Sequence, residues 1–288
     1  MKKIMKTLLV IVLIAAILLS GYNLYKISAQ YTGEARTKEK MLRYRPESPA
    51  SQNKSADNNV NNNAAPAGAP NAPNAQGTQG TQSAQGADPG EDTETEVNNP
   101  APPVIIVNQS VIDMQSDVNS DIVGWLTIPD TRIDYPFVKA ADNDYYLRRN
   151  VYRAQAAAGS LFMDSRCAED FSDFNAIIYG HNMKNNSMFG EIKFFSERGF
   201  FDAHKSGTLY IKNNTFVLRV FAYMVVRAND GIIYNPAADR DEFYSYVKEN
   251  ARQYQEPSTW GNVVTLSTCA YEYEGARMVL IAEIIPNS

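Results

Sequence analysis

The sequence contains few residues of the kinds that cross-link a fold or bind a metal. Only two of its 288 residues are cysteine, and only two are histidine. Two cysteines cannot build a disulfide framework, so the fold must rest on an apolar core. Cys167 and Cys269 could form a single bridge or stay as free thiols, and the sequence leaves both possibilities open. The cysteines and histidines are scattered without ligand spacing, so we expect no metal site.

A surplus of basic residues is also missing. The chain has 27 Lys and Arg against 32 Asp and Glu, for a formal net charge of -5. This balance gives no electrostatic footprint for nucleic acid, so we expect no nucleic-acid partner. Hydrophobic residues make up 44% of the chain but are strongly segregated. We therefore divide the sequence into three parts, residues 1–27, 28–103 and 104–288.

Residues 1–27 have the pattern of a cytoplasmic tail and a transmembrane anchor. Three lysines precede an uninterrupted apolar run, Leu8–Leu19, and tyrosines follow as interfacial anchors. A cleaved signal peptide is the alternative, but Ile27-Ser28-Ala29 is a poor cleavage site and lies far from the apolar run. Basic residues flank both ends of the run, so charge alone does not set the orientation of the anchor.

Residues 28–103 are predicted to be a juxtamembrane segment and a flexible tether. A short helix is expected over Glu34–Arg45. From about Ser48 the chain consists mainly of Asn, Ala, Pro, Gly, Gln, Ser and Thr, with almost no large apolar residue. The conformational entropy lost on ordering such a segment would not be offset by burial of apolar surface, so we interpret it as a low-complexity spacer.

Residues 104–288 are long enough for one well-buried domain and hold nearly all the aromatic residues outside the anchor. About eight short strands are indicated, which favours a closed β-barrel or a sandwich. Residues 208–213 and 215–226 are expected to form a hairpin with Asn213-Asn214 as the tight turn. Residues 239–254 carry the one strong helix pattern, with acidic residues first and basic residues late.

The last two predicted strands bring a thiol and a guanidinium together. If Thr265–Cys269 pairs with Arg277–Ile281, Cys269 lies opposite or near Arg277 on one face. The guanidinium would stabilise a thiolate and donate hydrogen bonds to a developing oxyanion. A nucleophilic thiol also needs a proton partner. His181 is favoured because it follows a strand end on a glycine-shaped loop, whereas His204 lies in a polar turn.

Each of these residues also has a plainer interpretation. A cysteine at a strand end is often a small buried hydrophobe, and an arginine after a turn is often a solvated charge. Cys167 is interpreted as an incidental free thiol. The residue types alone therefore leave a non-catalytic role open.

Several motifs in order resemble those of class B sortases. The segment around the cysteine is "TLSTC", and the segment around the histidine is "IIYGHNM", followed by "SMFGEI". Three earlier segments, "GWLTIPDTRIDYPFV", "DNDYYL" and "GSLFMD", are similar to early parts of that family. The resemblance covers residues 121–285, almost the whole domain.

The resemblance implies a mostly β fold, an eight-stranded sortase-type barrel with an N-terminal helix. It also implies a long helix between strands six and seven that forms one wall of the substrate groove. Cys269 would be the nucleophile, His181 the general acid and base, and Arg277 the group that stabilises the oxyanion. The implied substrate-binding residues are Asn143, Leu147, Tyr179 and Ser267. Ala270, after the nucleophile, is given no role, and no cofactor is implied.

The implied activity is that of a membrane-anchored cysteine transpeptidase. It would cleave a C-terminal sorting signal of secreted proteins after Thr and join the Thr carbonyl to a peptidoglycan cross-bridge or precursor amine. The domain would lie outside a Gram-positive cell on a single-pass anchor, with the tether lifting the active site toward the wall. Three alternatives remain open: a pilin-polymerising sortase, a cysteine peptidase that uses water, and a non-catalytic extracellular binding module.

Overall fold

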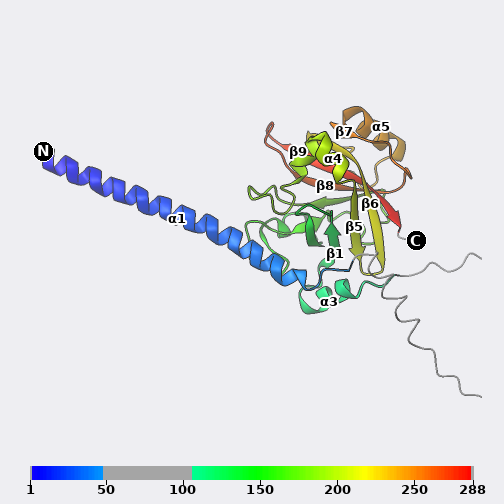
Figure 1. The fold of residues 1–288 in the computed structure, drawn as a ribbon, viewed down its shortest axis with the longest axis horizontal. Coiled ribbons are helices and arrows are strands. Elements are labelled where there is room, and N and C mark those ends of the chain that lie inside the picture. The colour runs from blue at the N-terminus through cyan, green and yellow to red at the C-terminus, as the bar shows by residue number, and fades with distance from the viewer. Residues whose placement is uncertain (1, 48–105, 287–288) are drawn as a thin grey trace, which may run out of the picture. The chain divides into compact units, whose positions relative to one another are not determined.

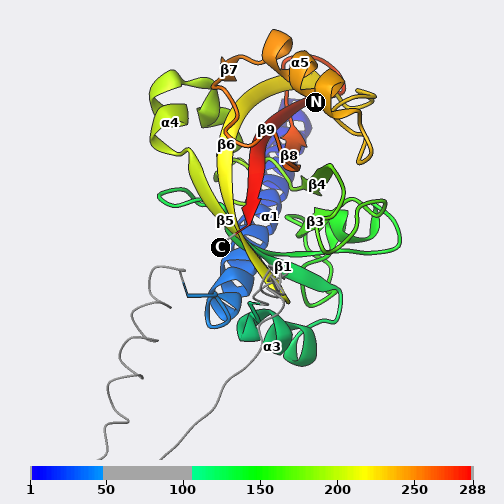
Figure 2. The same cartoon turned by 90° about the vertical axis from the view of Figure 1, so that its right-hand side faces the viewer.

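A computed structural model describes residues 2–47 and 106–286 of the chain. The low-complexity part of the predicted tether lies outside these residues. The described strands form one sheet, shown in Figure 1 and, turned by 90°, in Figure 2. Their bounds are β1 Ile122–Thr127, β2 Asp134–Val138, β3 Leu161–Met163, β4 Asn175–Tyr179, β5 Ser206–Ile211, β6 Asn214–Arg227, β7 Gln253–Tyr254, β8 Val263–Cys269 and β9 Ala276–Pro286.

The sheet closes on itself. Its strand order is β5-β1-β2-β3-β4-β8-β9-β6-β7, and an additional β5–β6 pairing joins the first strand to the last long one. Eight strands therefore form a closed barrel, and the two-residue β7 extends from β6. Closure removes exposed strand edges, which a sandwich would leave. The predicted mostly β, eight-stranded barrel is confirmed.

The barrel has apolar residues on both sides of its last strand. In β9, Met278, Leu280 and Ala282 belong to the main core cluster, whereas the alternate residues Val279 and Ile281 belong to a second cluster. Successive side chains of a strand point to opposite faces, so a strand covered on both faces shows an almost continuous apolar run. The helix α5 supplies part of this second cover through Phe243 and Val247.

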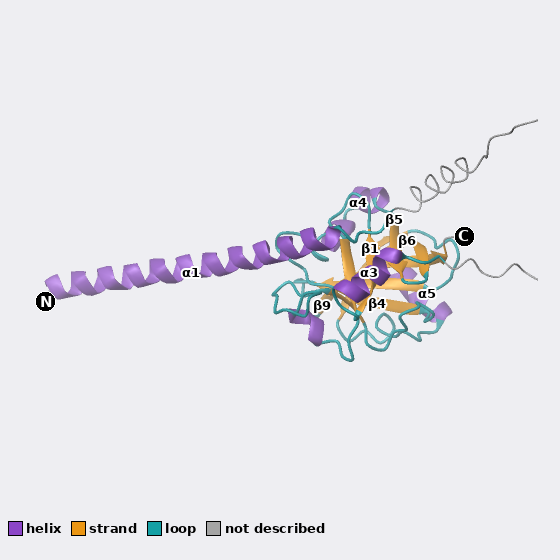
Figure 3. Ribbon diagram, turned by 90° about the horizontal axis from the view of Figure 1, so that it is seen from below, coloured by secondary structure: helices purple, strands orange, loops and turns teal. Residues whose placement is uncertain are grey.

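The helices of the domain are short and lie around the strands (Figure 3). They are α3 Gln109–Asp117, η1 Tyr145–Arg148, η2 Ile192–Ser196, α4 Arg198–Ala203 and α5 Arg240–Asn250. α5 begins where the sequence predicts, because the Asp239 side chain caps it by accepting from the Glu242 amide at 3.0 Å. It ends at Asn250, short of the predicted residue 254, and Gln253–Tyr254 form β7 instead. The helix α5 lies between the sixth and seventh strands of the barrel, as expected, and α3 lies at the opposite end (Figures 1 and 2).

The predicted turn of the β5–β6 hairpin is wrong by one residue. Ile211 pairs with Asn214, so the two turn residues are Lys212 and Asn213. The Asn108 amide donates to the Lys212 carbonyl at 2.9 Å, and the Asn108 side chain donates to the Asn214 carbonyl at 2.7 Å. This contact from a distant segment fixes the turn, and local turn propensity could not show it.

The N-terminal helix α1 is longer than predicted. It runs without a break from Lys2 to Leu42, so the separate short helix expected over Glu34–Arg45 is wrong, and most of that stretch is the end of α1. No proline occurs before Pro46, and nothing in the sequence therefore forces the helix to stop earlier. By length and composition the helix could cross a membrane between Met5 and Leu42.

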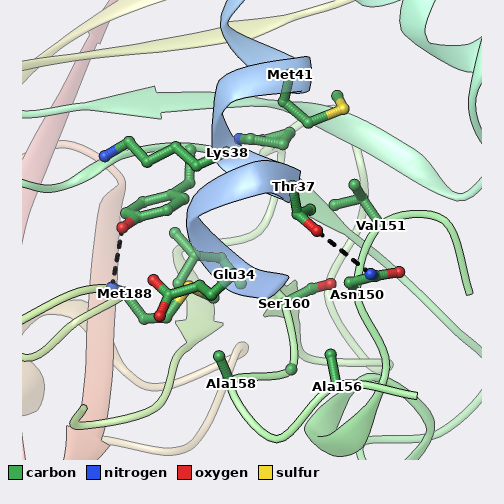
Figure 4. Close-up of a pocket in the computed structure, with 14 residues that line it drawn as sticks. Glu34, Thr37, Lys38, Met41, Asn150, Val151, Ala156, Ala158, Ser160 and Met188 are labelled. Carbon is green, nitrogen blue, oxygen red and sulfur yellow. Dashed lines mark hydrogen bonds between the residues drawn. The ribbon is translucent and has the colours of Figure 1, made fainter. Parts of the chain in front are cut away.

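The end of α1 packs against the barrel. Met41 is 1% exposed and joins an apolar cluster with Val111 and Trp125. The Lys38 ammonium lies 4.0 Å from the centre of the Tyr135 ring. Figure 4 shows a narrow, largely apolar cavity at this junction, where the side chains of Thr37 and Asn150 are hydrogen-bonded.

Candidate active site

The β8–β9 hairpin has the register that the sequence predicts. Cys269 pairs directly with Arg277, and the strands are antiparallel. Directly opposite residues of such a pair share a face of the sheet. The Ala270 amide donates to the Ala276 carbonyl at 2.9 Å and closes the loop, in which Gly275 has a φ of +76°. The hairpin therefore places the thiol and the guanidinium on one side of the barrel.

A parallel pairing brings the histidine to the same place. β4 pairs with β8 so that Tyr179 lies beside Ser267, and the Gly180 amide donates to the Ser267 carbonyl at 3.0 Å. His181 follows at once, and the Asn182 side chain donates to the Cys269 carbonyl at 2.9 Å. A Cβ at Gly180 would lie 2.4 Å from the Leu161 side chain, so only glycine fits this approach.

One open pocket of about 240 Å³ joins all seven predicted site residues. Cys269, His181 and Arg277 line it, and so do the four predicted substrate-binding residues, Asn143, Leu147, Tyr179 and Ser267. These residues come from the β8–β9 hairpin, from β4 and its following loop, and from η1 with the residues before it. The pocket thus gathers segments that are far apart in the sequence.

The ring of His181 is held by a backbone carbonyl. Its Nε2 lies 2.7 Å from the Leu147 oxygen. A carbonyl oxygen can only accept, so Nε2 carries the proton and Nδ1 is left to exchange one. His204 is placed differently: its ring stacks on Phe200 with centroids 3.9 Å apart, and it does not line the pocket. The preference for His181 over His204 therefore agrees with the geometry.

Comparison with known proteins identifies the family of the chain. The sortase domain family profile matches residues 126–285. The chain belongs to the sortase family. It is 36% identical to sortase B of Listeria monocytogenes over 186 residues, which cover 62% of this chain and 75% of that protein.

Two solved structures are also similar to this sortase. Sortase B of Clostridium perfringens matches with a TM-score of 0.56 and 29% identity, over 60% of this chain and 98% of that one. A class B sortase of Streptococcus pyogenes involved in pilus biogenesis matches with a TM-score of 0.56 and 32% identity, over 60% and 96%. The resemblance to class B sortases is confirmed, and the chain is a sortase-family transpeptidase by membership.

Both cysteines of the sortase are free thiols. Cys269 is half-buried at the pocket, whereas Cys167 is 1% exposed within the core. A Cys167–Cys269 bridge, which would have consumed the nucleophile, is therefore absent from the structure. Arg277 donates to the Ala276 carbonyl at 3.0 Å and makes no ion pair with a carboxylate among residues 2–47 and 106–286. Within the same residues, no group of three or more His, Cys, Asp or Glu side chains could hold a metal.

Sequence reasoning missed several residues of the pocket. Tyr234 is the most informative, because its hydroxyl is 2.8 Å from the Ser267 Oγ and its ring stacks near Tyr179. Burial raises the pKa of Tyr234 to about 12, so its hydroxyl stays protonated at neutral pH. Tyr234 lies in an irregular segment between β6 and α5, and no motif or periodicity marks it. Four further lining residues were also not predicted as site residues: Phe162, Gly180, Ala228 and Thr268.

The expected role of α5 as a wall of the groove is not supported for this pocket. No residue of α5 lines it, and the segment before the helix contributes Ala228 and Tyr234 instead. The apolar face of α5 is occupied elsewhere, because Phe243 and Val247 pack onto the cluster that contains Phe221 and Val263. Because this apolar face is buried on the barrel, it is not available to a substrate.

Proposed function

We propose that this sortase is a membrane-anchored cysteine transpeptidase of the cell surface. It cleaves a C-terminal sorting signal of secreted proteins after a Thr and joins the Thr carbonyl to a peptidoglycan cross-bridge or precursor amine. One observation carries the proposal: the predicted nucleophile, proton carrier and cation line the same pocket as the four predicted substrate-binding residues. No cofactor is needed for this chemistry.

The first half of the reaction forms a thioester. The Cys269 thiol passes its proton to Nδ1 of His181, and the resulting thiolate attacks the Thr carbonyl carbon, so that the carbonyl oxygen becomes an oxyanion. Arg277, which has no carboxylate partner among the described residues, donates hydrogen bonds to that oxyanion. His181 then gives its proton to the leaving amine as the C–N bond breaks. The Leu147 carbonyl holds the His181 ring in place through Nε2, so the proton moves through Nδ1.

The second half transfers the acyl group to an amine. An acceptor amine attacks the thioester carbon, and His181 takes the proton that this amine loses. The C–S bond breaks, a new amide forms, and the thiolate of Cys269 returns. Atoms and charges balance without any redox partner. An open pocket suits these two steps, because the second substrate must reach the thioester after the first amine has left.

The position of the enzyme at the membrane follows from the same chemistry. The sorting signal and the wall amine lie outside the cell, so the barrel is proposed to be extracellular. Helix α1 supports a single anchor by its length and composition. It begins at the cytoplasmic side with Lys2, Lys3 and Lys6 in this orientation.

A pilin-polymerising activity is the second candidate. It is favoured by one observation, the similarity to the Streptococcus pyogenes class B sortase involved in pilus biogenesis. The two activities share the thioester and differ only in the acceptor, a wall amine or a lysine of a pilin. A non-catalytic binding module is less well supported, because Cys269 is free and lines the pocket.

The test uses the full chain in lipid nanodiscs. A library of random peptides fixed only at one Thr is incubated with candidate amines, and products are identified by mass spectrometry. We expect cleavage after Thr and a new amide, and Cys269→Ala to lower the rate by at least ~10³-fold. Cys167→Ala is the matched control and should keep the rate. A Cys269→Ala enzyme that still transfers would overturn the proposal, and water as the sole acceptor would indicate a peptidase.

A further inference from the structure

A fully buried carboxylate lies behind the wall of the pocket. Asp164 directly follows β3, and its side chain is 0% exposed, while its ion partner Arg166 is 56% exposed. Isolated burial of a charge is costly, so such a group persists only with full hydrogen bonding. Burial would raise the pKa of Asp164, but hydrogen bonds from Arg166 and Tyr179 and the charge of Arg166 together hold the pKa below its usual range. The carboxylate is therefore ionised at neutral pH.

Two of the groups bound to this carboxylate are pocket residues. The Tyr179 hydroxyl donates to Asp164 at 2.8 Å, and the Asn143 side-chain amide donates at 3.1 Å. Both donors line the pocket, whereas Asp164 does not. Among the described residues, Asp164 bonds to none of the three catalytic candidates. Its connections thus lead to two of the predicted substrate-binding residues and to none of the three predicted reacting groups.

The carboxylate fixes which way the amide of Asn143 points. The Asn143 nitrogen donates to Asp164, and its oxygen accepts from the Ser165 amide at 2.8 Å. With both ends bound, the side chain cannot flip. One N–H and one lone pair remain, and their directions are set by the protein. An amide held in this way can bond an extended peptide without losing rotamer freedom on binding.

The carboxylate also fixes the ring of Tyr179. Because the hydroxyl is bound to Asp164, Tyr179 presents its ring to the pocket. That ring lies nearly parallel to the Tyr234 ring, with an interplanar angle of 20° and centroids 6.2 Å apart. Tyr234 in turn bonds Ser267, two residues before the nucleophile. One line of contacts therefore runs from the buried carboxylate to the strand that carries Cys269.

We propose that Asp164 is a positioning residue for substrate binding, which holds Asn143 and Tyr179 in the orientation that receives the peptide. The proposal rests on the proposed function of the pocket. Asp164 acts on binding and leaves the chemistry at the thiol unchanged, because it contacts neither the nucleophile nor its partners. Loss of the carboxylate therefore raises KM and has little effect on kcat.

The main test is Asp164→Asn in the full chain in nanodiscs, assayed with the best peptide from the Thr-fixed library. The asparagine keeps the volume but cannot accept from all of the bound donors. We expect KM to rise about tenfold, equal to about 1.4 kcal/mol, and kcat to stay within about twofold. The rate at which iodoacetamide alkylates Cys269 should not change. Asp173→Asn is the control, because Asp173 accepts a backbone hydrogen bond in the same loop and has no pocket partner.

Two further measurements separate a positioning role from a merely structural one. In the background Asn143→Ala with Tyr179→Phe, Asp164→Asn should add less than about twofold to KM, because its targets are already gone. Tyr179→Phe alone removes only the hydroxyl on Asp164 and should raise KM by a smaller factor. If Asp164→Asn folds poorly, Tyr179→Phe still tests the hydrogen bond between Asp164 and Tyr179.

The inference and the proposed function can fail separately. Peptide affinity is also measured in the Cys269→Ala chain, where no chemistry occurs. Unchanged peptide affinity and unchanged KM in Asp164→Asn would overturn the inference and leave the transpeptidase proposal intact. The inference would also be overturned if Asp164→Asn raised KM by the same factor in wild type and in the Asn143→Ala with Tyr179→Phe background. Failure of the wild-type chain to transfer would overturn the proposed function, and the binding comparison would still decide the role of Asp164.

Discussion

The two thiols of the chain have opposite surroundings. Cys167 is 1% exposed, and its sulfur accepts from the Ile177 amide at 3.4 Å. Burial raises the pKa of Cys167 to about 11. Cys269 instead lies half-buried at an open pocket beside a guanidinium. Because the thiolate is the reactive form, environment rather than residue type decides which cysteine reacts.

This contrast predicts selective alkylation of the native chain. At pH 8 a thiol with a pKa of about 11 is ionised in roughly one molecule in a thousand, and the fold also blocks reagent access. We expect iodoacetamide to add one label per native chain, on Cys269, and two labels after denaturation. Peptide mass spectrometry locates the label. Native labelling of Cys167 at a rate similar to that of Cys269 would contradict the prediction.

At the scale of elements, the sequence was sufficient where a pattern is local. The start of α5 and the Cys269–Arg277 register were both predictable, because each depends on neighbours in one helix or hairpin. The motifs around Cys269 and His181, together with "DNDYYL", allowed seven of the pocket residues to be named in advance. Tyr234 and Asp164 could not be found in this way, since the pocket residues that they bond, Ser267 for Tyr234 and Asn143 and Tyr179 for Asp164, lie in other segments of the chain. The β5–β6 turn was misplaced for the same reason, because distant Asn108 fixes it.

Strand β9 contains a buried charge that joins elements. Glu283 is fully buried and forms an ion pair with Arg219 of the neighbouring strand β6 at 3.3 Å. Its carboxylate also accepts from the backbone amides and hydroxyls of Ser258 and Thr259 and from the amide of Trp260. Burial would raise the pKa of Glu283, but the hydrogen bonds from Ser258 and Thr259 lower it below its usual range. The carboxylate therefore ties the loop before β8 to the barrel.

We expect Glu283→Gln to destabilise the barrel by about 1–3 kcal/mol at pH 7, because glutamine leaves buried donors unpaired. A lowered folded pKa gives stability that is present above the unfolded value and is lost as pH falls through the folded value. The difference in free energy of unfolding between wild type and Glu283→Gln should therefore become smaller below about pH 4. Urea unfolding in detergent at several pH values measures it. The control is Glu249→Gln, on the exposed side of α5, which should have the same free energy of unfolding as wild type at pH 7. If Glu283→Gln were destabilised by the same amount at every pH, the ionised state of Glu283 would not be the source of the stability.

At the scale of the whole molecule, helix α1 is continuous from the apolar run to the barrel. The tether hypothesis needs a flexible connection between membrane and active site, and the low-complexity residues lie outside the described part. The chain is already bound to the barrel before those residues begin, through Arg45 and Asp134 at 3.1 Å. It is bound again after them, where Asn108 contacts the β5–β6 turn. We therefore expect α1, rather than residues 48–103, to set the distance of the pocket from the membrane.

Two adjacent residues of α1 test this docking. Met41 is 1% exposed in the cluster with Trp125 and Val111, and Leu42 is 42% exposed. We expect Met41→Ala to destabilise the barrel by about 2–5 kcal/mol and Leu42→Ala by less than about 0.5 kcal/mol. Urea unfolding of the full chain in detergent, followed by tryptophan fluorescence, measures the difference, since Trp125 lies in the same cluster.

The same pair distinguishes a docked helix from a free one. A docked helix protects residues 34–45 from proteolysis, and Met41→Ala should expose this stretch while Leu42→Ala leaves it protected. A barrel cut off at residue 104 lacks Met41 and leaves the face of Trp125 uncovered, so it should unfold at a lower temperature than the full chain. Two results together would mean that the helix is not docked: the two substituted chains are equally stable, and residues 34–45 are already cleaved in wild type. The barrel would then be joined to the membrane by a flexible connection.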